Sequence, residues 1–289
     1  MVERRRCGSA TPRSVATVAA VGFAHDELLG PLRDNGFVVL RGAVQSERCD
    51  AVVEALVDVL GISLDDPSTW DRISPSLDMV PMWGHQSQWE IRQLPNLYEA
   101  WSTIWDRSDL WVDVNSCRVT PPWSPSRADA LPIHFDVDPH DVAQQWYPGL
   151  VALTDAPADH GGFRGVPSLF RDRHRWPTTW PVAGELQPAL CDDDEIVEVQ
   201  LSKGDVLIWD SHLPHGTVRN NGPSPRAVFY VQMHPPGGPA DLEERLADVE
   251  AGRAPPWVRW KVGHDRIDRH DIELSALGQR LLGVEPWDR

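Results

Sequence analysis

The chain has 289 residues, of which 41% are hydrophobic and 24% charged, which is enough apolar material for one large buried core. Its formal net charge of −16 at pH 7 argues against nucleic acid and anionic membrane surfaces as partners. No run is long and apolar enough to span a bilayer, and the four scattered cysteines contain no CxxC pair, so we expect a cytoplasmic protein with reduced thiols.

The N-terminal part, to about residue 109, is expected to be mainly helical after a disordered tail at residues 1–22. Asn35-Gly36 is a helix-stop signal, and residues 37–40 have the apolar pattern of a short buried strand. Ser46 predicts the cap of a helix that ends at Gly61.

A long irregular segment is expected next, at residues 62–95. It is rich in Trp, Met, Gln and Pro, so its aromatic side chains either fill the core or cover a substrate. Asn96 then predicts the cap of a further helix, with Glu99 completing a capping box.

The middle of the chain changes to short apolar runs separated by Pro, Gly and Asp. We expect strands at residues 110–120, 133–136, 149–154, 195–201, 206–210 and 227–233, and helices again at residues 240–250 and 274–282. Many short strands with such turns indicate a sandwich or barrel. The expected fold is mainly β with flanking helices, in one domain at residues 23–289, with a β core at about 110–235 and a helical C-terminal extension at 236–289.

His134 and Asp136 form the only His-x-Asp pair in the chain. Residues two apart on a strand project from the same face, so both side chains can reach one ion. A second imidazole would complete the facial triad of non-haem Fe(II) oxygenases, which leaves three coordination positions open. His215, at the end of an expected strand, is preferred for this role over the competing His212, because of the residues that follow it.

Thr217 and Arg226 follow His215 by two and eleven residues. A guanidinium holds a carboxylate through two charge-assisted hydrogen bonds, and a hydroxyl can add a third. This arrangement suits the distal carboxylate of 2-oxoglutarate. The alternative for Arg226 is a surface salt bridge.

Taken in order, these motifs resemble the phytanoyl-CoA dioxygenase-like family of Fe(II)/2-oxoglutarate-dependent oxygenases. The motifs are the stretch at residues 35–43, His134-Phe135-Asp136, Gly161-Gly162-Phe163 with Val166-Pro167, Gly204-Asp205, His215-Gly216-Thr217, Arg226, and the C-terminal residues 274–287. One departure is Pro167-Ser168-Leu169-Phe170, where members often carry Pro-Gly-Ser-His or Pro-Gly-Phe-His. We expect it to affect local shape or substrate fit.

The resemblance implies a double-stranded β-helix (jelly-roll or cupin-like) core with His134, Asp136 and His215 as iron ligands. It implies that Arg226, with Thr217, binds 2-oxoglutarate; Gln145 and Asn115, with Gln144 and Trp146, are candidates for contacting its proximal carboxylate. The implied cofactors are Fe(II), 2-oxoglutarate and O2. The retained Asp136 counts against halogenation, because halogenases of this type lack the carboxylate ligand.

The expected reaction oxidises an unactivated C–H bond of a small metabolite of secondary metabolism and releases succinate and CO2. We do not carry over an acyl-CoA substrate, because an acidic chain with almost no lysine offers no evident site for a CoA tail. Two alternatives stay open: a cupin-like metal dioxygenase that does not use 2-oxoglutarate, and a non-catalytic binding protein on the same fold. The protein is expected to be a monomer or a homodimer.

Overall fold

A computed structural model describes residues 17–19, 24–73, 79–125, 130–157, 159–176, 191–256, 258–259 and 267–287. Within them the helices are α1 (His25–Asn35), α2 (Ser46–Leu60), α3 (Gln86–Arg92), α4 (Pro95–Trp105), α5 (Pro167–Arg171), α6 (Pro239–Ala251) and α8 (Ala276–Leu282). The strands are β1 (Thr17–Ala19), β2 (Phe37–Arg41), β3 (Trp111–Val112), β4 (Cys117–Thr120), β5 (Gly149–Ala152), β6 (Phe163–Gly165), β7 (Val197–Val199), β8 (Val206–Trp209), β9 (His215–Thr217), β10 (Arg226–Val231) and β11 (Met233–His234). Short 3-10 helices are η1 (Pro67–Arg72), η2 (Val142–Gln144), η3 (Arg173–Arg175) and η5 (Asp193–Glu195).

Two of the sheets determine the architecture. The larger one has six strands in the order β1-β2-β8-β5-β10-β4, and the smaller one has three in the order β7-β6-β9. An isolated bridge between His134 and His215 continues the smaller sheet beyond β9. The expected mainly β fold with flanking helices is therefore confirmed.

The two sheets enclose one core cluster between them. It contains Leu150, Ala152, Leu207 and Val228 from the larger sheet and Phe163 from the smaller. Because side chains alternate along a strand, every second residue of β5, β8 and β10 faces this space. We use the name inner chamber for the region between the two sheets, where this cluster packs.

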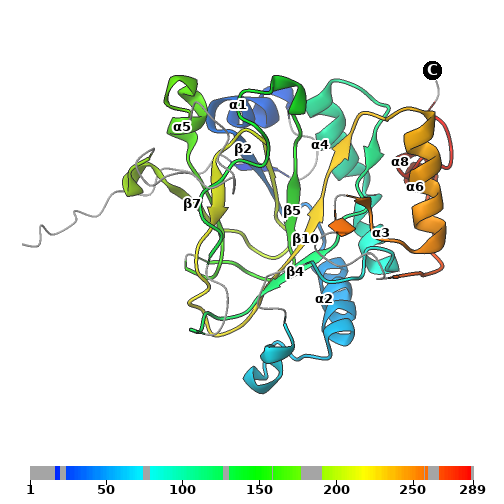
Figure 1. Cartoon of the computed structure of the whole chain (residues 1–289), viewed down its shortest axis with the longest axis horizontal. Helices are drawn as coiled ribbons and strands as arrows, with labels where there is room; N and C mark the ends of the chain where they lie inside the picture. Colours follow the sequence, from blue (N-terminus) through cyan, green and yellow to red (C-terminus); the bar gives the residue numbers. More distant parts are fainter. Residues whose placement is uncertain are drawn as a thin grey trace, which may run out of the picture.

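The other face of the larger sheet is covered by helices. Its alternate residues, such as Val151, Ile208 and Phe229, belong to a separate core cluster that includes the fully buried Trp89 and Trp101. Figure 1 shows α3, α4, α6 and α8 to one side of β5 and β10, with β7 on the other. Most of the Trp-rich stretch thus serves as core, and the inner chamber stays on the side away from these helices.

Several expected boundaries are confirmed and several are wrong. Gly36 does end α1, in the left-handed conformation with φ 78°. The cap of α2 is Gln45 rather than Ser46, and the cap of α4 is Leu94 rather than Asn96. Asn96 instead donates from its side chain to the carbonyl of Ala43, because Pro95 already occupies the first helical position.

The expected irregular segment at residues 62–95 contains η1 and α3, and the Nδ1 of His85 caps α3 by accepting from the backbone N–H of Ser87. The expected strand at 110–120 is two strands, β3 and β4, and residues 133–136 form only the single bridge at His134. Most of the tail lies outside the described residues, but residues 17–19 form β1, which pairs in parallel with β2. Among the described helices, none has the length and apolar character needed to cross a membrane.

Candidate metal centre

His134, Asp136 and His215 come together at one end of the inner chamber. One ligand atom from each lies within 4.8 Å of the other two, and this is the one such cluster of three within the described part of the chain. His134 and His215 are placed by their backbones, since each N–H donates to the carbonyl of the other, at 2.8 and 3.0 Å. The set of two imidazoles and one carboxylate suits non-haem iron.

Both imidazoles are oriented by backbone carbonyls. The Nδ1 of His134 lies 2.9 Å from the carbonyl oxygen of Pro132, and the Nδ1 of His215 lies 2.9 Å from that of Leu213. A carbonyl only accepts, so Nδ1 carries a hydrogen in both rings, and the Nε2 atoms of both rings face the carboxylate of Asp136. Such hydrogen bonds are typical of histidines that bind metals through the opposite nitrogen.

Asp136 lies between the two rings. Its carboxylate oxygens are 3.6 Å from the Nε2 of His134 and 3.6 Å from the Nε2 of His215, and one of them accepts a 3.1 Å hydrogen bond from the Nε1 of Trp209. Burial would raise the pKa of the Asp136 carboxyl, but His215, His134 and the Trp209 N–H together hold that pKa well below its ordinary range. The carboxylate is therefore charged and able to bind a cation at neutral pH.

His215 lies in an aromatic environment. Its ring stacks on Phe163, with centroids 5.3 Å apart and an interplanar angle of 12°, and Trp209 lies at 5.3 Å on a tilt. Burial lowers the pKa of His215, against the opposing effect of Asp136, which favours the neutral imidazole that a metal requires.

Gly216 permits the close approach of the two segments that carry the ligands. A Cβ at this position would lie 2.6 Å from the carbonyl oxygens of both Leu131 and Pro132. Any larger residue would push the segment of His134 away from β9. The glycine that follows His215 is therefore required on steric grounds.

Arg226 is the first residue of β10 and is only 4% exposed. It shares a strand face with Val228, two residues on, so it points into the inner chamber. Its Nε and Nη2 are buried and have no hydrogen-bond partner among the described residues. The alternative of a surface salt bridge is wrong for this residue, and two unsatisfied donors on a buried guanidinium fit a carboxylate ligand.

Comparison with known proteins agrees with this geometry. Residues 129–228 match the family model described as phytanoyl-CoA dioxygenase (PhyH), and the matched segment contains the three clustered residues and Arg226. The predicted resemblance to the phytanoyl-CoA dioxygenase family is confirmed. A Dictyostelium discoideum protein named "Putative phytanoyl-CoA dioxygenase" is 21% identical over 308 residues, covering 86% of this chain and 84% of the relative.

Solved structures share the fold. A hypothetical protein from Escherichia coli, JW0805, superposes with a TM-score of 0.64 at 15% identity, covering 93% of this chain and 85% of that one. The epimerase SnoN, solved in complex with Fe3+, alpha ketoglutarate and nogalamycin RO, gives a TM-score of 0.53 at 17% identity, covering 73% and 83%. At 15% and 17% identity, these likenesses show that the fold is shared.

Thr217 and Gln145, the next predicted site residues, are not part of the metal-ligand cluster. Thr217 lies on β9 opposite Phe163, and its Oγ1 accepts from the N–H of Leu131 at 2.9 Å, which leaves its own hydrogen to donate. Gln145 donates to Tyr147 and to Asp210, so its amide is committed away from the metal-ligand cluster.

Asn115 and His212 are also outside the cluster. The backbone carbonyl of Asn115 accepts a hydrogen bond from the buried Arg92, whose guanidinium packs over the ring of Trp89 on the helix-covered side. His212 is buried, lies 3.1 Å from a carboxylate oxygen of Asp210 and stacks on Trp176. The geometry thus brings His215, and not the competing His212, to the cluster.

Two further residues were not foreseen, Trp209 beside the cluster and Arg118 near Arg226. Trp209 could have been suspected, because it ends the strand that leads to His215. Arg118 on β4 is 8% exposed, and its Nε also has no partner among the described residues. The only sequence signal for Arg118 is a lone arginine in an apolar strand.

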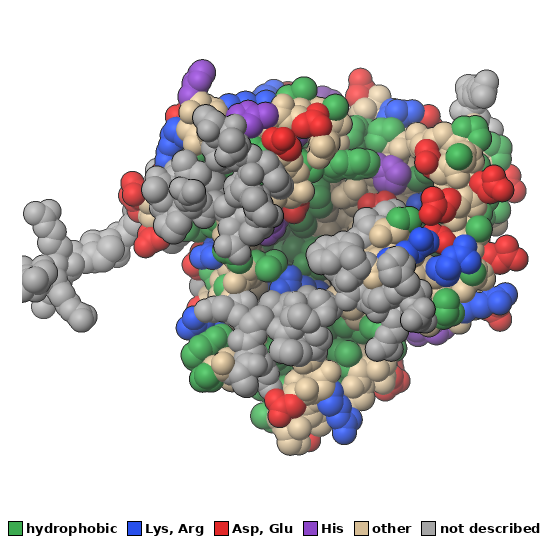
Figure 2. Space-filling view, viewed as in Figure 1, with side chains coloured by type: hydrophobic (Ala, Val, Ile, Leu, Met, Phe, Trp, Pro, Cys, Tyr) green, Lys and Arg blue, Asp and Glu red, His purple; other side chains and the backbone are tan. Residues whose placement is uncertain are grey.

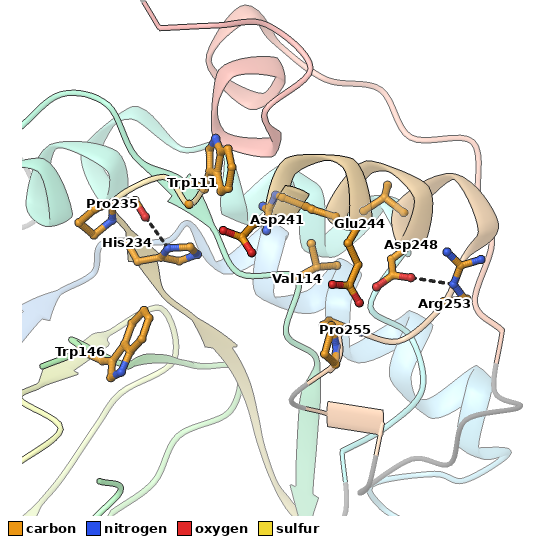
Figure 3. A pocket seen from close by; sticks show the side chains of 14 residues that line it. Trp111, Val114, Trp146, His234, Pro235, Asp241, Glu244, Asp248, Arg253 and Pro255 are labelled. Carbon is orange, nitrogen blue, oxygen red and sulfur yellow. Dashed lines mark hydrogen bonds and ion pairs between the residues drawn. The ribbon is translucent and has the colours of Figure 1, made fainter. Parts of the chain in front are cut away.

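A cavity of about 320 Å³ opens beside the β10 end of the sheet. Figure 2 shows this face of the molecule hollowed, with hydrophobic side chains inside the hollow. Figure 3 shows Trp111, Trp146 and His234 on one side of the cavity and the acidic side chains of α6 on the other. Trp146 exchanges hydrogen bonds with Ser211, so this wall is tied to the segment that leads to His215.

Proposed function

We propose that this protein is an Fe(II)- and 2-oxoglutarate-dependent dioxygenase that oxidises a C–H bond of a small metabolite and releases succinate and CO2. The proposal includes a double-stranded β-helix core within a single domain at residues 23–289. One observation carries it: a His-Asp-His cluster shares the inner chamber with the buried guanidinium of Arg226, whose Nε and Nη2 have no partner among the described residues. The phytanoyl-CoA dioxygenase match supports the same assignment.

His134, Asp136 and His215 would hold the iron through two Nε2 atoms and one carboxylate. When bound, the iron, with 2-oxoglutarate and O2, supplies the oxidising power for breaking the C–H bond. Arg226 binds the distal carboxylate of 2-oxoglutarate through its unsatisfied donors, and Thr217 can donate its hydroxyl hydrogen to the same group. Trp209 keeps Asp136 oriented and charged.

We assign the substrate to the cavity beside Trp146, whose backbone is hydrogen-bonded to Ser211 on the segment that leads to His215. Its walls include Trp111, Val114 and Pro255, and its rim carries the carboxylates of α6. Apolar walls with a few polar groups are typical of sites for small organic molecules. Arg245 is not available to such a ligand, because its guanidinium donates to the carbonyls of Val112, Leu281 and Leu282.

A cupin-like dioxygenase without 2-oxoglutarate would need the three ligands but not Arg226. Placing a guanidinium in the chamber without a ligand to pair it is costly, and this favours the 2-oxoglutarate-dependent reading. A non-catalytic binding protein would have no need for two imidazoles with their Nε2 atoms turned to a common carboxylate.

The test is an anaerobic titration of the full chain, first with Fe(II) and then with 2-oxoglutarate. We expect a weak visible charge-transfer band from the chelate. Arg226→Met should weaken 2-oxoglutarate binding roughly 10- to 100-fold, because two charge-assisted hydrogen bonds are lost. Arg48→Met, which removes a surface arginine paired with Glu90, is the control and should bind as the wild type does. Iron binding with no band would instead favour the cupin-like enzyme, and absence of iron binding would favour the non-catalytic protein.

A further inference from the structure

The cavity beside Trp146 has an aromatic wall, which consists of Trp111, Trp146 and His234. The ring of His234 lies 5.7 Å from that of Trp146 and 6.5 Å from that of Trp111, with interplanar angles of 73° and 89°. Trp146 is 40% exposed, although its N–H and its carbonyl are both hydrogen-bonded to Ser211, at 3.0 Å. A large aromatic ring that is fixed beside a cavity and left open to solvent indicates a surface for a ligand.

The polar atoms of His234 are used within this wall. Its Nε2 lies 3.1 Å from a carboxylate oxygen of Asp113, and its Nδ1 lies 2.8 Å from the carbonyl oxygen of Pro235. Asp113 is buried, and its charge is matched by the imidazole inside the protein. The wall therefore offers a ligand aromatic rings rather than a free nitrogen or the carboxylate of Asp113.

The guanidinium groups beside the cavity are also matched. Arg245 donates to three backbone carbonyls. Arg253 lies 2.7 Å from one carboxylate oxygen of Asp248, and Arg259 donates to the other oxygen. Within the part of the chain that the structure describes, the cavity thus offers little to an anionic ligand.

Two carboxylates on the side opposite the aromatic wall are less well matched. Asp241 and Glu244 lie three residues apart on α6, which places them on the same face of the helix. Asp241 accepts a hydrogen bond from the N–H of Gly238 at 2.7 Å, and Glu244 lies 3.9 Å from Arg259, whose closer contact is with another carboxylate. Figure 3 shows both acidic side chains across the cavity from the aromatic wall. Among the described residues, no arginine closely pairs with either of them.

From this arrangement we infer that the substrate is an amine that is protonated at neutral pH and carries an apolar frame. The inference rests on the proposed function, because it names the substrate class of the same site. The ammonium group lies between the two carboxylates and the aromatic wall, since carboxylates accept hydrogen bonds from N–H groups and aromatic faces attract cations. Val114, Pro255 and Pro256 supply apolar surface for the frame. The net charge of −16 also favours the approach of a cation.

The experiment compares three ligands of similar shape and different charge. 2-Phenylethylamine is a cation at neutral pH, 2-phenylethanol is neutral, and 3-phenylpropanoate is an anion. Their affinities are measured by calorimetric titration of the full chain, with and without 2-oxoglutarate and Mn(II) in place of Fe(II). We expect the amine to bind roughly tenfold more tightly than the alcohol, and the anion to bind most weakly. Equal binding of the amine and the alcohol overturns the inference.

The double variant Asp241→Asn/Glu244→Gln removes the two charges and keeps the shape of both side chains, and Asn can still accept from the Gly238 N–H. It should lower the affinity for the amine roughly tenfold and leave that for the alcohol unchanged. Glu54→Gln/Asp58→Asn, which removes the same two charges from exposed positions on α2, is the matched control and should keep the preference for the amine. If the cavity double variant also keeps that preference, the inference is wrong.

Nuclear magnetic resonance tests whether the amine reaches the metal. Paramagnetic Mn(II) should broaden the proton signals of the bound amine, whereas diamagnetic Zn(II) should not. Binding without broadening places the amine too far from the metal to be the substrate, and the inference is then wrong.

The failure of the inference and that of the proposed function can be told apart. If the wild type binds Mn(II) and 2-oxoglutarate but does not prefer the amine, the inference is wrong while the proposed function stands. If the wild type prefers the amine but binds neither Mn(II) nor 2-oxoglutarate, the proposed function is overturned, and with it the assignment of the amine as substrate.

Discussion

Trp209 links core packing to the charge state of the metal centre. Its ring packs against Phe163 and His215, and its Nε1 donates to Asp136 at 3.1 Å. The same side chain therefore excludes water on one side and fixes a carboxylate on the other. Residues that orient metal ligands in this way commonly contribute 10- to 100-fold to metal affinity.

Trp209→Phe should lower Mn(II) affinity about tenfold, because the aromatic packing is largely kept while the hydrogen bond to Asp136 is lost. The measurement is calorimetric titration of the metal-free protein. Trp70→Phe removes an indole donor that binds the carbonyl of Ser63, far along the chain from the centre, and serves as the matched control. Equal Mn(II) affinity in Trp209→Phe and the wild type would contradict the orienting role.

At the scale of the elements, the centre depends on how closely β9 approaches the segment at residues 131–134. Four backbone groups of His134 and His215 join them, and Thr217 adds a donor and an acceptor to Leu131. Gly216 lies in the middle of this contact, where a Cβ would be 2.6 Å from two carbonyl oxygens. The separation of the two histidines is therefore set by a residue without a side chain.

Gly216→Ala should reduce Mn(II) affinity at least tenfold and lower the melting temperature, because the added methyl group forces the two segments apart. Gly30→Ala is the control, since a Cβ there meets nothing within 4 Å and Ala favours the helix α1. Calorimetry and thermal unfolding are measured on both variants. A Gly216→Ala protein with wild-type affinity would show that the two segments need no close contact.

Features that depend on neighbouring residues in the sequence were predicted well. Features that depend on contacts between distant segments were not. The end of α1 at Gly36 could be predicted because a helical pattern is followed directly by a residue that tolerates positive φ. The helix α3 was missed because its cap is a histidine and its first residues are polar, so neither the usual cap nor an apolar stripe marks it. Residues 133–136 form a single bridge to His215 rather than a strand, and no local pattern in the sequence specifies how far this pairing extends.

At the scale of the whole molecule, the ligand set could be predicted but its surroundings could not. The His-x-Asp pair and the later His-Gly are local motifs, and the structure brings them together. The inward direction of Arg118 depends on the register that pairs β4 with β10, and no local pattern specifies that register. The inner chamber is thus a property of two sheets, whose paired strands lie far apart in the sequence, as β2 and β8 or β4 and β10 do.

This long-range assembly predicts that the metal and 2-oxoglutarate stabilise the fold as a whole. The clustered histidines lie at the smaller sheet and Arg226 lies on the larger one, so the metal and 2-oxoglutarate bind the folded chain and not the unfolded one. At a hundredfold excess over the dissociation constant, a ligand adds about 2.7 kcal/mol to the free energy of unfolding, or roughly 5–10 °C in melting temperature. Thermal unfolding is measured with chelator, with Mn(II), and with Mn(II) plus 2-oxoglutarate.

We expect the melting temperature to rise in that order for the wild type and for His25→Ala, whose histidine is exposed at the start of α1. His215→Ala should lose the rise with Mn(II), and Arg226→Met should keep it but lose the further rise with 2-oxoglutarate. A His215→Ala protein that Mn(II) stabilises as strongly as the wild type would place the metal elsewhere. The separate losses in the two variants distinguish the metal centre from the carboxylate site within one chamber.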